Sequence, residues 1–115
     1  MTTSAPHVQI ANTMLLQLGG QPFCYMTGAK DLIALTANEK EEHLGGLQFG
    51  LPRGLAKKGI NKVRVLLLLS DTYKVEALKV NAREHTYEVI AEAEGVYCDQ
   101  LAEVFRDLTG LATSL

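Results

Sequence analysis

The stretch from Val63 to Val80 constrains the fold of this chain more than any other segment. It is typical of two β-strands joined by a tight turn at Ser70–Thr72, where short side-chain oxygens can accept bonds from the following backbone N–H groups. The first strand is largely apolar on both alternating faces, because leucine occupies every position from Leu66 to Leu69. A strand with two apolar faces belongs inside a sheet and not at its edge. The second strand alternates apolar residues with Lys74 and Glu76, so we expect it to be half exposed.

Hydrophobic periodicity predicts a helix near each end of the chain and strands between them. A period of 3.6 residues predicts helices over Pro6–Leu18 and from Asp99 to a left-handed Gly110. Pro22 is expected to prevent the first helix from resuming. Residues 37–46 are polar and end in two glycines, which predicts a solvated loop. Strands are predicted over residues 23–26, 31–36 (with a single helical turn as the alternative), 47–51, 63–69, 73–80 and 86–94.

These elements predict one α+β domain over residues 1–115, with residues 1–5 frayed. The predicted order, α-β-β-β-β-β-α, counts five of these six candidate strands, in a curved, mainly antiparallel, five-stranded sheet. We expect the N-terminal and C-terminal helices to pack on one face of the sheet, because each has a single apolar stripe to bury.

The composition favours a cytoplasmic globular protein without a membrane partner. The longest apolar run, Val65–Leu69, is far shorter than the ~20 residues of a transmembrane helix. The N-terminal residues lack the basic and apolar regions of a secretory signal. Cys24 and Cys98 are too few for a disulfide framework and too far apart for a zinc knuckle, so we expect both to be reduced and part-buried.

No sequence motif points to catalysis, a metal ion or a cofactor. His7, His43 and His85 do not lie at ligand spacing with other metal-binding residues, and we expect them on the surface. The Gly28–Lys30 turn lacks the GxxxxGK[ST] pattern of a phosphate loop and the helix that follows it. Cys24 has no partner base at a recognisable spacing. We therefore expect a non-enzymatic protein, with an enzyme of unrecognised site as the lesser alternative.

Charge is sharply divided along the chain. Residues 53–83 include eight basic and two acidic residues, a net charge of +6, whereas residues 84–115 include seven acidic residues and one basic residue, a net charge of −6. Clustered cations displace counterions from phosphates, and glycines let a loop follow a nucleic-acid backbone. We therefore predict nucleic-acid binding through a basic loop; a solvated loop that keeps the apolar hairpin soluble is the alternative. The predicted binding residues are Arg53, Lys57, Lys58, Lys62 and Arg64.

The acidic part of the chain provides a second candidate surface. It is either a solvated face or a surface complementary to a basic groove, in which case the protein would block a nucleic-acid-binding machine. Opposite patches could also pair between two copies, which makes a homodimer a further possibility. The candidate protein-binding residues are Glu88 and Glu92, expected to share a strand face with Glu94, and Asp99, Glu103 and Asp107, expected on one helix side.

Short motifs from about Gln17 to the C-terminus resemble a family of short, mostly uncharacterised proteins of bacteriophages, prophages and plasmids. The resemblance implies a mobile genetic element in a bacterial cytoplasm, and it carries no catalytic residues. Small proteins of such elements include replication accessories, transcription factors and inhibitors of host defences. The alternative function is therefore a protein-binding inhibitor of a host defence system, such as an anti-CRISPR protein, that acts through the acidic residues. Residues 37–46 form a longer segment than the resemblance implies. The motifs are Gln17-Leu18-Gly19-Gly20, Phe23, Met26-Thr27-Gly28-Ala29-Lys30, Leu47-x-Phe49-x-Leu51-Pro52-Arg53, Asn61-x-Val63, Asp71-x-Tyr73-x-Val75, Gly95-Val96-Tyr97 and Thr109-Gly110-Leu111.

Overall fold

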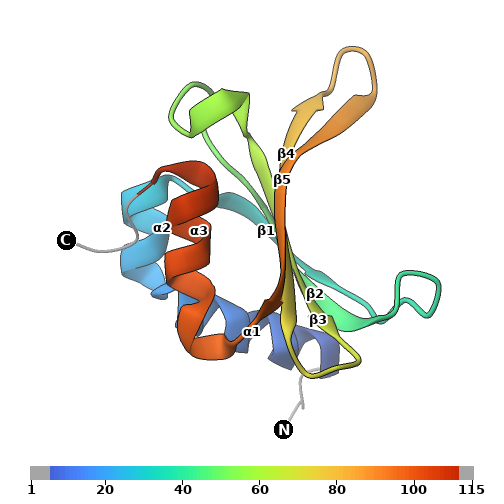
Figure 1. Ribbon diagram of the computed structural model, residues 1–115. Coiled ribbons are helices and arrows are strands. Elements are labelled where there is room, and N and C mark those ends of the chain that lie inside the picture. Colours follow the sequence, from blue (N-terminus) through green and yellow to red (C-terminus); the bar gives the residue numbers. More distant parts are fainter. Residues whose placement is uncertain (1–5, 112–115) are drawn as a thin grey trace, which may run out of the picture.

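The computed structural model describes residues 6–111 and shows an antiparallel five-stranded sheet with helices on one face (Figure 1). The predicted α+β class and sheet are confirmed; the predicted fraying of residues 1–5 lies outside the described residues. The strands follow one another in space as they do in sequence. They are β1 (Lys30–Leu35), β2 (His43–Gly50), β3 (Lys62–Leu68), β4 (Tyr73–Asn81) and β5 (Thr86–Val96). The helices are α1 (Pro6–Leu18), α2 (Gln21–Thr27) and α3 (Leu101–Thr109), with short 3-10 turns η1 (Lys57–Gly59) and η2 (Cys98–Gln100).

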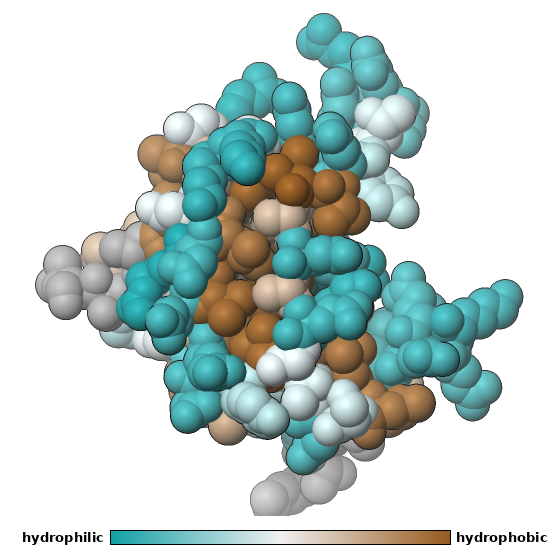
Figure 2. Space-filling model, viewed as in Figure 1, coloured by the Kyte–Doolittle hydropathy of each residue, from teal (hydrophilic) through white to brown (hydrophobic). Residues whose placement is uncertain are grey.

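The apolar strand β3 lies inside the sheet, as its pattern predicted, and is its central strand. Val63 and Val65 are buried against the helices, and Leu66 is buried on the opposite face. Apolar side chains also reach the surface between α3 and β5, where Figure 2 shows a hydrophobic band. The centre of the core is an aromatic cluster with ring centroids 5.0 to 6.0 Å apart, formed by Phe23 of α2, Phe49 of β2 and Phe105 of α3.

Helix α2 corrects the strand predicted over residues 23–26. Pro22 lies in the first turn of this helix, where its missing N–H leaves no bond unmade, so it begins a helix and does not merely end α1. Gly28, with φ of 72°, ends α2 in the left-handed conformation. The burial of Phe23 among the other core aromatics outweighs the strand preference of this aromatic segment.

The predicted loop over residues 37–46 is also partly wrong, because β2 begins at His43. Asn38 and His43 pair across a short hairpin tip that joins β1 to β2. Gly46 is a strand residue that pairs with Leu66, and a Cβ at this position would lie 2.2 Å from the Val65 carbonyl oxygen. The glycines that suggested a loop therefore allow two strands to approach closely.

A β-bulge in β5 changes which face its acidic residues occupy. Ala77 pairs with Ala91, but Leu78 pairs with Val89, so Ile90 is the extra residue. On the two sides of the bulge, side chains alternate between the faces of the sheet in opposite phase. The prediction that Glu88, Glu92 and Glu94 share one face was therefore wrong: Glu88 pairs with Lys79 on the helix side, and Glu92 pairs with Glu76 on the opposite face.

Several predicted exposures also need correction. β4 is mostly buried instead of half exposed, since both Glu76 and Leu78 are buried on the face without helices. Cys24 is half-buried as expected, whereas Cys98 is exposed, and both are free thiols. None of the helices within residues 6–111 has the length and apolar character needed to cross a membrane.

Candidate functional site

A broad concavity of about 840 Å³ lies at one end of the sheet. Because neighbouring strands are antiparallel, the start of β1, the end of β2, the start of β3 and the end of β4 meet at this end. The loop that contains η1 and the β4–β5 hairpin flank it, at the upper end of the sheet in Figure 1. Residues distant in sequence therefore line one surface.

The lining of this concavity is strongly basic. It contains five cationic side chains, whereas Asp31 is its acidic residue. Within residues 6–111, none of these five cations takes part in an ion pair within 4.0 Å. Five cations and one carboxylate give the lining a net charge of +4. The five cations of the concavity are Lys30, Arg53, Lys62, Lys79 and Arg83.

Asn61 holds the strand ends together at this concavity. Its side-chain Nδ2 donates to the Val80 carbonyl at 2.9 Å, and its Oδ1 accepts from the Val80 N–H at 2.8 Å. Its backbone N–H donates to the Leu78 carbonyl at 2.9 Å, and its carbonyl accepts from the Leu51 N–H at 2.8 Å. One residue thus links the ends of β2, β3 and β4, which gives the concavity a fixed floor.

Gly50 separates two of the five cations. It pairs with Lys30 on one side and with Lys62 on the other, so all three lie in one row across β1, β2 and β3. Opposite residues of antiparallel strands project from the same face. Because Gly50 has no side chain, the row leaves a trough between the two lysines.

The structure brings together only part of the predicted basic loop. Arg53 and Lys62 line the concavity, whereas Lys57 and Lys58 lie in η1, exposed and outside its lining. The aliphatic stem of Lys57 faces Gly110 at the end of α3.

Three cations of the concavity were not among the predicted binding residues. Lys79 and Arg83 belong to the basic part of the chain that charge counting identified. Lys30 had no comparable signal, because it is 23 positions before Arg53 in the sequence. Only the pairing of β1 with β2 brings Lys30 to this site.

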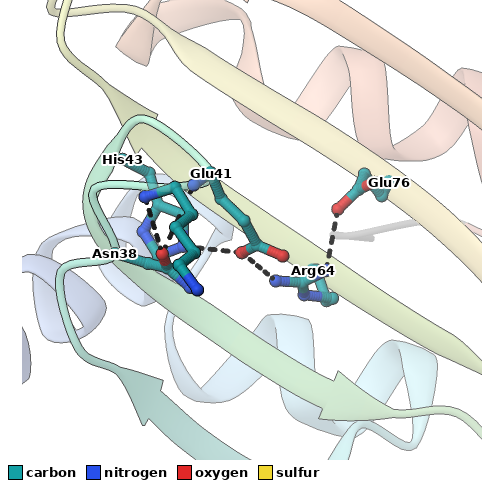
Figure 3. A network of polar contacts seen from close by, with 6 residues as sticks. Asn38, Glu41, His43, Arg64 and Glu76 are labelled. Atoms are coloured by element: carbon teal, nitrogen blue, oxygen red, sulfur yellow. Dashed lines mark hydrogen bonds and ion pairs between the residues drawn. The ribbon is translucent and has the colours of Figure 1, made fainter.

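Arg64, the fifth predicted binding residue, has a different environment (Figure 3). Its Nη1 donates to Glu76 on β4 at 3.2 Å, and its Nη2 donates to Glu41 of the hairpin tip at 3.1 Å. Glu41 also contacts Nε2 of His43 at 3.0 Å. Asn38 shapes the tip, because its Oδ1 accepts the N–H groups of two of the following residues. Arg64 is therefore a structural cation, neutralised by two carboxylates.

Two pKa shifts follow from ion pairs on the face of the sheet without helices. The hydrogen bond from His43 and the charge of Arg64 lower the pKa of Glu41, although burial opposes the shift. Burial alone would lower the pKa of Lys74, but the charges of Glu76 and Glu92 and the contact with Glu94 outweigh burial and raise it. Both groups are held in their charged forms, as expected for groups that anchor a surface.

His43 corrects the expectation of a surface histidine, since its side chain is only 3% exposed. Its Nδ1 is buried and has no hydrogen-bond partner among the described residues. A ring nitrogen that is closed off in this way is not accessible to a substrate. Within residues 6–111, no three His, Cys, Asp or Glu side chains are grouped so that they could hold a metal ion.

The candidate acidic residues do not form one surface. Glu92 shares Lys74 with Glu94 on the face without helices, whereas Glu88 lies on the helix side opposite Lys79. The other candidates belong to the C-terminal segment and are exposed: Asp99 in η2, and Glu103 and Asp107 on α3.

The concavity thus concentrates five cations that make no ion pair within residues 6–111 at one end of the sheet. No protein-family model, curated protein or solved structure matches this chain.

Proposed function

We propose that this protein is a non-enzymatic nucleic-acid-binding protein whose basic concavity contacts the phosphate backbone. The observation that supports this proposal most strongly is the convergence, from separate segments of the chain, of five cations that make no ion pair within the described part of the structure. Clustered cations of this kind gain affinity by releasing the counterions condensed on a nucleic acid.

The hydrogen-bonded floor of the concavity also supports nucleic-acid binding. The four hydrogen bonds of Asn61 hold the strand ends that carry Lys62 and Lys79 before any ligand arrives. Prior ordering of a binding surface reduces the entropy lost on association. The trough at Gly50 lets a backbone approach the sheet between Lys30 and Lys62.

We further propose that the protein serves as an accessory factor of a phage or another mobile element in the bacterial cytoplasm, as its sequence resemblance implies. Inhibition of a host defence protein through acidic residues is the alternative proposal. It has less support, because the β5 bulge separates Glu88 from Glu92, and Glu92 already contacts Lys74.

Fluorescence anisotropy with labelled oligonucleotides tests the proposed function. The double variant Arg53→Gln/Lys62→Gln removes two cations of the concavity, and Lys57→Gln/Lys58→Gln removes two cations of the same loop outside it. Both variants change the net charge equally, so nonspecific attraction changes equally. We expect the first variant to reduce the slope of log affinity against log salt by roughly 1.5, and the second to leave it near the wild-type slope.

Two outcomes contradict the proposal. Equal losses in both double variants would assign the binding to general loop charge instead of the concavity. A wild-type protein that binds neither single-stranded nor double-stranded nucleic acid at about 50 mM salt, where phosphate contacts are strong, would refute nucleic-acid binding itself.

A further inference from the structure

The face of the sheet that carries no helix continues the basic concavity across all five strands. Strand pairing places five residues in one row across the sheet, one from each strand. With roughly 4.8 Å between neighbouring strands, the row spans roughly 19 Å. Cations occupy the β1 half of this row, and apolar residues occupy the β5 half. The row consists of Lys30, Gly50, Lys62, Leu78 and Val89.

Tyr87 lies beside the apolar half of the row. It precedes Val89 by two positions on β5 and pairs with Val80, which lines the concavity. Alternation along the strand places Tyr87 and Val89 on the same face. Tyr87 is 72% exposed, and Val89 is exposed beside it. Most of this aromatic ring therefore contributes nothing to the core and is available to a ligand.

An exposed aromatic ring on the same sheet face as a pair of cations has the chemistry that recognises a single strand. Cations contact the phosphates, while bases stack on the ring whatever their sequence. In a duplex the base faces are already stacked on one another, so only an unpaired strand can use both groups at once.

We infer that this surface binds single-stranded DNA or RNA, with Tyr87 as a stacking platform for a base and Lys30 and Lys62 as phosphate contacts. This inference rests on the proposed function and defines its substrate class. The strand runs across the sheet, from the lysines at β1 and β3 to the tyrosine at β5.

Competition binding with a labelled oligothymidylate of about 12 nucleotides, within the range of site sizes for such surfaces, tests the inference. We expect unlabelled single strands to compete better than a duplex of equal phosphate content. Tyr87→Ala should weaken binding of the single strand by roughly 5- to 150-fold, the range for loss of one stacked base. Tyr87→Phe should retain most of the affinity, because stacking requires the ring and not the hydroxyl.

Tyr25→Ala is the matched control, since Tyr25 is 88% exposed on α2 in the helical layer. It should bind as the wild type does, and thermal unfolding should show that the tyrosine variants remain folded. If Tyr87→Ala binds like Tyr25→Ala while Arg53→Gln/Lys62→Gln loses affinity, the stacking inference fails and the proposed function stands. Preference for the duplex likewise refutes the inference. Absence of all binding refutes the proposed function together with it.

Discussion

Arg64 and Lys62 lie two residues apart on the same face of β3, yet the structure predicts opposite effects when each is replaced by glutamine. Arg64→Gln removes the partner of Glu76, whose side chain is only 11% exposed. Removing one partner of a buried ion pair costs roughly 3–5 kcal/mol. Arg64 is itself 24% exposed, and Lys74 still attracts the charge of Glu76, so we expect a loss of about 2 kcal/mol. The exposed Glu41 adds little.

Urea unfolding followed by circular dichroism measures this loss. With a denaturant dependence of about 2 kcal/mol per molar urea, the unfolding midpoint of Arg64→Gln should fall by about 1 M. Lys62→Gln removes no ion pair found in residues 6–111, so its stability should change by less than about 0.5 kcal/mol. In anisotropy measurements the order reverses: Lys62→Gln weakens nucleic-acid binding, and folded Arg64→Gln retains it.

A double-mutant cycle separates the Arg64–Glu76 pair from other effects of these substitutions. Glu76→Gln combined with Arg64→Gln should cost less than the sum of the two single substitutions, because the second removes a partner already lost. The structural role of Arg64 is refuted if Arg64→Gln is as stable as the wild type and also loses nucleic-acid binding as strongly as Lys62→Gln does.

Two further predictions test the packing of the sheet and its response to pH. Gly46→Ala should destabilise the fold by about 2 kcal/mol, because the new Cβ would lie 2.2 Å from the Val65 carbonyl oxygen. The control Gly50→Ala, whose Cβ would have its nearest neighbour at 3.7 Å, should unfold near the wild-type temperature. Equal melting temperatures for the two variants would contradict this prediction. Burial raises the pKa of Tyr73 despite its hydrogen bond to Gln17, so the folded pKa exceeds the unfolded one. The stability that neutral Tyr73 contributes is therefore present below about pH 10 and lost as the pH rises further. In urea titrations from about pH 9 to pH 11, the free energy of unfolding should fall less steeply with pH for Tyr73→Phe than for the wild type. An equally steep fall in both proteins would refute the role given to Tyr73.

The elements that sequence reasoning predicted well are those with a strong local signal. Helix α1 has the predicted bounds, and β3 is the central strand, because a regular apolar stripe and a strand apolar on both faces each allow few placements. The short helix α2 was missed because its residues are aromatic and typical of strands. It is specified by the burial of Phe23 against two other elements, which no local pattern contains.

The candidate site was predicted only in part for a related reason. Charge counting located the basic segment but could not distinguish paired from unpaired cations. Arg64 is neutralised because the hairpin tip brings Glu41 across the sheet, and Lys30 joins the concavity through β1–β2 pairing. The bulge at Ile90 likewise reverses the face of Glu88, and strict alternation along the sequence contains no sign of that insertion.

Lysine footprinting tests the central claim most directly. The protein is treated with an acetylating reagent in the presence and absence of a single-stranded oligonucleotide, and modification at each lysine is measured by mass spectrometry. If the concavity binds nucleic acid, Lys30, Lys62 and Lys79 are protected, whereas Lys57 and Lys58 in the same basic part of the molecule are modified to the same extent with and without the oligonucleotide. Protection of Lys57 and Lys58 with the other three lysines unprotected would contradict the claim.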